Sequence, residues 1–201
     1  AYTTLTVLCA LIIQQDAKML DGGQKFTESS ITEWMQLTFI LGTSVIFYFT
    51  GKLNEPLQPI AYLVCGGFIV ILIRELDGYL DVIYNGSWLP PALVAFTVTL
   101  WIVSRRRQHF AGSIRRFVAT PAFGLFVGGG LGIFVFSRLF GYKGIWKAIF
   151  QVESLDPFGP QKWVKNAAEE GSELFGYCLV FCAAVELFAY ARRVKKSATA
   201  A

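Results

Sequence analysis

Apolar and polar residues follow one another along this chain in long blocks, and the apolar blocks set its architecture. Predominantly apolar runs cover approximately residues 2–20, 31–50, 59–76, 89–103, 118–140 and 167–191. A helix needs about 20 such residues to cross the roughly 30 Å hydrocarbon core of a bilayer. The pattern predicts an all-α integral membrane protein with about six transmembrane helices, which form a single transmembrane domain over residues 1–201.

The first run is the weakest of the six. It is apolar only as far as Ile13, after which Gln14, Gln15 and Asp16 follow. Thirteen helical residues cover about 20 Å, less than the hydrocarbon core. If the segment crosses the membrane, these polar side chains need polar neighbours below the far surface. A segment lying in the interface is the alternative, and the sequence leaves the two open.

Composition supports a membrane protein. Hydrophobic residues make up 54% of the chain and charged residues only 16%, whereas a soluble domain carries about 25% charge. The four cysteines all fall inside apolar runs, which argues against a disulfide framework and favours a packing role. They are Cys9, Cys65, Cys178 and Cys182.

The distribution of basic residues predicts the orientation, because short cytoplasmic loops are rich in lysine and arginine. Six spans place the connection at 105–116 and the C-terminal tail on one side. That side carries ten of the 18 basic residues: Lys52, Arg105, Arg106, Arg107, Arg115, Arg116, Arg192, Arg193, Lys195 and Lys196. We therefore expect both termini in the cytoplasm and a bacterial-type inner membrane. The basic connection is interpreted as the topological signal, with lipid head-group contact beside it and no nucleic-acid partner.

Two further segments carry packing and surface signals. Gly124, Gly128 and Gly132 form a stripe of small residues, which lets helix backbones approach closely in lipid. The stripe fits packing within the chain, self-association or contact with another subunit. In the long outer loop 141–166, residues 144–152 have the spacing of a short amphipathic helix lying in the head-group region.

With this topology, polar residues from five of the six runs gather at the outer face. We call this set the polar cluster. It consists of Gln14, Asp16, Glu33, Gln36, Arg74, Glu75, Asp77, Arg138, Glu169, Glu170 and Glu173. Ionisable groups at a membrane boundary are costly unless they are paired or hydrated. The cluster is therefore either a structural network or a ligand site.

Helix capping explains part of the cluster. Glu33 stands three residues after Ser30, and Glu169 three residues after Asn166, as in a capping box. Glu75 and Asp77 are expected at a helix C-terminus, where the helix dipole disfavours acids. The best structural explanation for the remaining groups is a pair of ion pairs, Arg74–Glu75 and Arg138–Glu173.

The residue types limit the cofactor chemistry. His109 is the only histidine and belongs to the opposite face, which makes bis-histidine haem and histidine-ligated zinc unfavourable. A cation bound by oxygen ligands suits the acids better. The candidate ligands are Glu75, Asp77, Glu170 and Glu173.

Three functions are compatible with these features. The favoured one is a small membrane protein without catalytic activity, either an accessory subunit of a membrane complex or an outer-leaflet cation-binding protein. A proton or cation transporter is the second, for which only Glu186 continues a polar path inward. The third is an enzyme acting on a lipid or lipid-linked substrate, with paired carboxylates for acid–base chemistry and Arg74 and Arg138 as head-group ligands.

Overall fold

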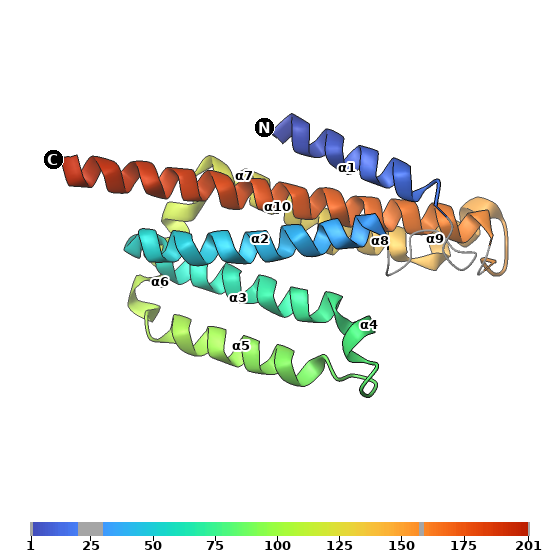
Figure 1. Ribbon diagram of the computed structural model, residues 1–201, viewed down its shortest axis with the longest axis horizontal. Coiled ribbons are helices and arrows are strands. Elements are labelled where there is room, and N and C mark those ends of the chain that lie inside the picture. The colour runs from blue at the N-terminus through green and yellow to red at the C-terminus, as the bar shows by residue number, and fades with distance from the viewer. Residues whose placement is uncertain (1, 20–29, 157–158, 201) are drawn as a thin grey trace. The chain divides into compact units, whose positions relative to one another are not determined.

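The computed structural model describes residues 2–19, 30–156 and 159–200, and these residues are helical without any strand (Figure 1). The prediction of an all-α chain is confirmed for them. The elements are α1 (Tyr2–Asp16), α2 (Ile31–Leu53), a 3₁₀ turn (Glu55–Leu57), α3 (Gln58–Glu75), α4 (Asp77–Leu80), α5 (Leu89–Ser104), α6 (Arg107–Val118), α7 (Pro121–Leu131), the π-helical turn η2 (Gly132–Phe136), α8 (Ser137–Gly141), α9 (Lys143–Phe150) and α10 (Pro160–Ala200).

Four helical stretches are long and apolar enough to cross a membrane. They are Ile31–Leu53, Glu55–Glu75, Pro121–Gly141 and Pro160–Ser197. These stretches identify a helical membrane protein. The apolar α5 has 16 residues and α1 has 15, so both are shorter than a full crossing. The count of six spans and the orientation stay predictions.

The last helix is longer than the sequence pattern indicated. We expected it over 167–191, but α10 begins at Pro160 and continues to Ala200. Proline suits a first helical turn, and Lys165 pairs with Glu169 one turn later, which supports the added segment. The predicted capping box at Asn166–Glu169 is therefore wrong, because these residues lie inside the helix.

The basic connection is also helical. The hydrophobic pattern predicts no helix over residues 104–117, yet α6 occupies most of this segment. Ser113 and Phe117, spaced by one helical turn, are buried, while Arg107, Arg115 and Arg116 are exposed. The buried Ser113 and Phe117 attach α6 to the rest of the unit. Two buried positions among many arginines do not form a recognisable helical pattern in the sequence.

The chain divides into two compact units, each described by itself below. The first consists of residues 1–36 and 127–180, and the second of residues 37–126 and 181–201. The candidate polar residues of α1, α8 and the first half of α10 all belong to the first unit.

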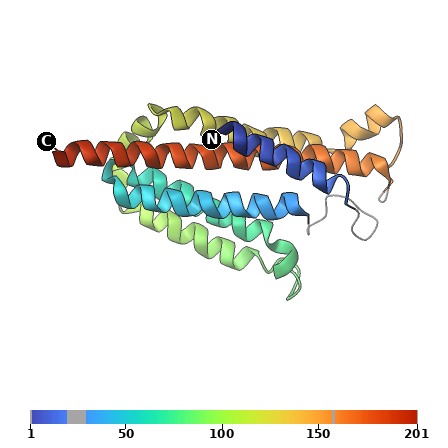
Figure 2. The ribbon, with the colours of Figure 1, turned by 45° about the horizontal axis from the view of Figure 1, so that its top comes forward.

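Within the second unit, α3 packs against both α2 and α5 (Figure 2). The ring of Tyr62 lies against the backbone of Gly51 on α2 and stacks on Tyr48, with ring centroids 6.0 Å apart. On the other side, Gly66 of α3 meets the side chain of Thr99 on α5. Small residues therefore allow these helices to approach closely.

Within the first unit, α10 packs closely against the segment from α7 to η2. A Cβ atom added at Gly129 would lie 2.6 Å from the carbonyl oxygen of Gly176, and one at Gly132 would lie 3.2 Å from Gly176 Cα. Gly124 has no atom within 4 Å of such a Cβ, and Gly128 only one at that limit. Of the predicted stripe, only Gly132 makes a close approach, and Gly129 completes the contact.

Candidate functional site

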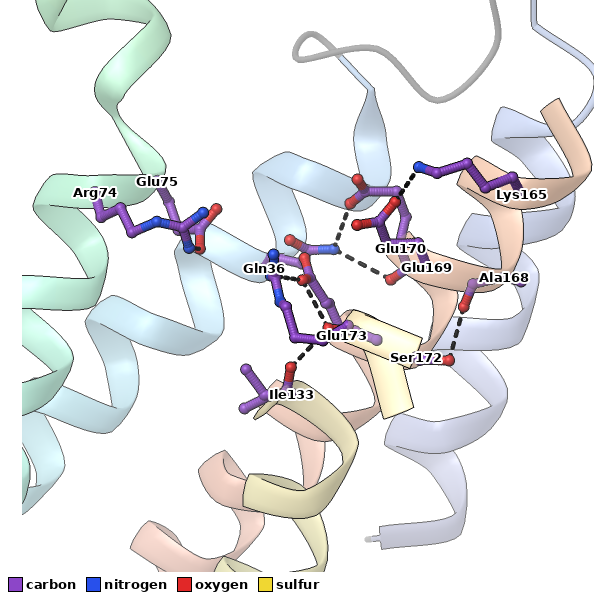
Figure 3. A network of polar contacts seen from close by, with 12 residues as sticks. Gln36, Arg74, Glu75, Ile133, Lys165, Ala168, Glu169, Glu170, Ser172 and Glu173 are labelled. Atoms are coloured by element: carbon purple, nitrogen blue, oxygen red, sulfur yellow. Dashed lines mark hydrogen bonds and ion pairs between the residues drawn. The ribbon is translucent and has the colours of Figure 1, made fainter. Parts of the chain in front are cut away.

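The polar residues of the first unit converge on the first half of α10. Lys165, Glu169 and Glu173 recur at intervals of four residues and share one helical face, and Glu170 lies beside them (Figure 3). Each of the three acids contacts a donor, and the donors come from different elements. The arrangement is described below from the most buried acid outward.

Glu173 is the most buried of these acids, with 5% of its surface exposed. The Arg138 guanidinium forms an ion pair with its Oε1 atom, and Ser137 Oγ lies 2.9 Å from the same atom. The Arg138 side chain is 48% exposed, so the pair joins a buried acid to a half-exposed base. The predicted ion pair Arg138–Glu173 is present in the structure.

A π-helical turn presents these donors to α10. The Ser137 backbone N–H bonds to the carbonyl of Gly132, five residues earlier, and the Ser137 hydroxyl lies 2.6 Å from the carbonyl of Ile133. The Ser137 hydroxyl thus donates to the Ile133 carbonyl, which the Ser137 backbone N–H would bond in a regular α-helix. π-Helical turns of this kind recur at functional sites, where they redirect side chains.

Glu170 is held by α2. The side-chain amide nitrogen of Gln36 donates to Glu170 Oε2 at 3.0 Å and to the Glu170 backbone carbonyl at 3.2 Å. Gln36 is 2% exposed. A buried amide must be hydrogen-bonded to be tolerated, so this contact fixes the start of α2 against α10.

Glu169 forms an ion pair with Lys165 on the same helix, and both side chains are largely buried. A side chain at Gly141, the last residue of α8, would collide with the Glu169 carboxylate. Any other residue at this position would displace the Glu169 carboxylate.

Asp16, the last residue of α1, caps the N-terminal end of α2. Its carboxylate accepts the backbone N–H groups of Ile31 at 3.1 Å and Thr32 at 2.6 Å, and also the Thr32 hydroxyl at 2.5 Å. Ser30 Oγ accepts the N–H of Glu33 at 3.2 Å, one half of the predicted capping box. The helix dipole favours an acid at this end. Gln14, by contrast, is exposed on α1.

The remaining acids of the polar cluster belong to the second unit. Arg74 and Glu75 are paired at 3.4 Å, as the sequence predicted. Asp77 directly follows Leu76, the C-cap of α3, and is also the first residue of the four-residue helix α4. Whether these three residues join the acids of α10 stays a prediction.

No three His, Cys, Asp or Glu side chains of the described residues are grouped closely enough to hold a metal ion. The four candidate ligands are divided between the units, Glu75 and Asp77 in one and Glu170 and Glu173 in the other. The divalent cation site therefore stays a prediction from sequence.

Comparisons with protein-family models, with characterised proteins and with solved structures found no match to this chain. Its function must therefore be argued from its own residues. Sequence reasoning missed Ser137 and the Gly129–Gly176 contact. Only the glycine-rich segment 124–132 gave a signal that could have located one of them.

Proposed function

We propose that this chain is a non-catalytic accessory subunit of a larger membrane complex. The observation that carries the proposal is the engagement of the acids of α10 by side chains of α2 and α8. Glu170 contacts Gln36, and Glu173 contacts both Arg138 and Ser137. Contacts of this kind fix the register of packed helices without performing chemistry. The acids thereby have a sufficient structural role.

The same contacts favour this role over the cation-binding one. A cation bound by Glu170 and Glu173 would have to displace the Gln36 amide and the Arg138 guanidinium from the carboxylates. Displacing Gln36 would leave a buried amide without its acceptor, at a cost of about 1–3 kcal/mol. The transport and lipid-enzyme hypotheses stay predictions from sequence.

A partner surface is proposed around α9. Three apolar residues in or near α9 and the start of α10 are each at least 48% exposed: Tyr142, Ile149 and Val164. Trp146 turns inward and donates to the carbonyl of Phe140 at 2.5 Å, so α9 is held with Ile149 pointing away from it. Exposed apolar groups on a segment outside the hydrocarbon core suit another protein surface.

Site-specific crosslinking tests the subunit proposal. A photoreactive residue at Ile149 in the full-length chain, in its native membrane, should crosslink mainly to one other membrane protein. The matched control is Val98, which is similarly exposed but lies on the apolar helix α5, and it should capture lipid. Lipid adducts alone at both positions would overturn the proposal.

The proposed topology has six crossings, made by the four long stretches together with α1 and α5, with both termini in the cytoplasm of an inner membrane. The support is the concentration of basic residues in α6 and the C-terminal tail. In a cysteine-free variant, a cysteine at Ser154 should react with an impermeant maleimide in intact cells, and one at Gly112 only after permeabilisation. The reverse pattern would contradict this orientation.

A further inference from the structure

A hollow of about 450 Å³ lies in the second unit where α5 gives way to α6, and we call it the arginine hollow. Its volume is within the range of small-molecule sites, roughly 300–1,000 Å³. Its lining combines aromatic rings, cations and one amide, and the residues that matter here are Gln58, Tyr62, Trp101, Arg105, Arg106 and His109. None of them belongs to the polar cluster.

Gln58 is the unusual member of this lining. It is 9% exposed, and its amide nitrogen donates to Tyr62 Oη at 3.1 Å. Its amide oxygen is buried and has no hydrogen-bond partner in the structure. Turning the amide over would only exchange which end lacks a partner. Buried polar atoms are almost always hydrogen-bonded, and Gln58 is one of the residues that line the hollow. A ligand that reaches the wall at Gln58 can supply the missing donor.

The cations of the hollow call for an anion. Arg105 lies over the ring of Trp101, 4.2 Å from its centroid, which holds the guanidinium at the wall. Arg106 also lines an adjoining hollow of about 370 Å³, together with Arg116 and the acid Glu55. Arginines thus outnumber acids around the two hollows. The planar guanidinium is suited to phosphate, which it binds through paired hydrogen bonds.

The backbone adds positive potential at the same place. Ser113 Oγ of α6 accepts the backbone N–H of Ile60 at 3.1 Å, which ties α6 to the first turn of α3. The N-terminal end of a helix carries a partial positive charge. The docking of α6 therefore brings its arginines to the end of α3 that favours an anion.

The apolar wall indicates an amphiphile. Trp101 is 56% exposed, and Val94 and Val98 continue the exposed apolar face of α5 toward its start. This face offers acyl chains a surface that a free phosphate would not use. Tryptophan is typical of the boundary between hydrocarbon and head groups.

We propose that the arginine hollow binds the head group of an anionic phospholipid that carries a hydroxyl group. The phosphate contacts Arg105 and Arg106, the head-group hydroxyl donates to Gln58 Oε1, and the acyl chains lie along α5. A glycerol head group has this chemistry. The site is independent of the subunit role proposed above, because it uses none of the residues of the first unit.

Native mass spectrometry of the full-length chain in detergent tests the site with three lipids and one soluble phosphate. Phosphatidylglycerol should remain bound and phosphatidylcholine should not. Phosphatidylmethanol, an anion without a head-group hydroxyl, should bind several-fold more weakly than phosphatidylglycerol. Soluble glycerol 3-phosphate should not compete at equal concentration. Equal binding of all three lipids, or full competition by the soluble phosphate, would overturn the proposal.

Two variants locate the site. R105Q/R106Q should weaken phosphatidylglycerol binding at least tenfold, while R107Q/R115Q, which removes the same charge from residues outside both hollows, should change it less than twofold. Q58L should abolish the preference for phosphatidylglycerol over phosphatidylmethanol but keep the binding of both, and Q58M repeats the test if Q58L misfolds. Equal losses in the two arginine variants would indicate diffuse attraction and contradict a site.

Discussion

Two buried glutamines, one in each unit, show two uses of a polar group in this chain. Gln36 places its amide nitrogen between two oxygens of Glu170, whereas Gln58 reaches Tyr62 with its nitrogen and leaves its oxygen without a partner. The first amide joins two helices. The second belongs to a residue that lines a hollow. The difference is therefore in what surrounds the residue and not in the residue type.

The two regions also differ in whether their basic residues are paired with acids. In the first unit, Arg138 and Lys165 each pair with a glutamate of α10. Around the arginine hollow, Arg105 lies over the ring of Trp101, and Glu55 is the one acid among the described residues that line the two hollows. In the first unit, paired opposite charges stabilise the packing of the helices. Around the hollow, the excess of positive charge favours a negatively charged ligand.

The largest effect is expected for Arg138→Leu, which leaves the buried Glu173 without its base. We expect a loss of about 3 kcal/mol in the free energy of unfolding, at the low end for a buried pair because Arg138 is half exposed. Arg74→Leu, in the exposed pair of the second unit, should cost less than about 1 kcal/mol. Unfolding by SDS in mixed micelles measures both, and equal losses would remove the distinction.

Gly129→Ala should destabilise the chain by about 2 kcal/mol, because the added methyl group meets the backbone of Gly176. Gly124→Ala, five residues earlier on the same helix, has open space and should stabilise the helix by up to about 1 kcal/mol. Thermal unfolding in detergent gives the sign of each change. Two losses of equal size would mean that Gly124 is also packed.

Asp16→Ala removes the cap of α2 and should cost about 1–1.5 kcal/mol. Its exposed neighbour supplies the control, since Gln15→Ala should change stability by less than about 0.5 kcal/mol. Hydrogen exchange locates the effect: the amides of Ile31 and Thr32 should lose protection only in the Asp16 variant. Unchanged protection would show that the cap is not formed.

The smallest effects come from the two glutamines. Gln36→Leu should cost about 1 kcal/mol, because it leaves Glu170 without the amide donor. Gln58→Leu should change the unfolding free energy by less than about 0.5 kcal/mol, because the lost Tyr62 bond is offset by removal of an unpartnered oxygen. If Gln58→Leu lowered the unfolding free energy of the lipid-free protein as much as Gln36→Leu does, Gln58 would be a structural residue.

The sequence predicted the helical class because apolar runs near 20 residues leave few alternatives. It predicted Arg138–Glu173 because an acid and a base at adjoining helix ends in a membrane need each other. It missed the start of α10, which is stabilised by the Lys165–Glu169 ion pair. It also missed α6, which is stabilised by its contact with α3 through Ser113. Neither segment is an apolar run.

Other features depend on contacts that no sequence pattern contains. The π-helical turn shifts the face of Ser137 and Arg138 by a local change in the hydrogen-bond ladder, and the glycines against α10 are Gly129 and Gly132 rather than the stripe Gly124–Gly128–Gly132. Gln58 gave no signal because a glutamine before a proline is typical of many helix starts. Its unpartnered oxygen becomes visible only with Tyr62 and the hollow in place.

The most direct test of the central claim, that the buried Glu173 of α10 holds the helices together, is a double-mutant cycle on Arg138 and Glu173. Arg138→Leu, Glu173→Leu and the double variant are unfolded by SDS under the same conditions. We expect a coupling free energy above about 1 kcal/mol, with the double variant more stable than either single one. Losses that add within about 0.3 kcal/mol would contradict the account.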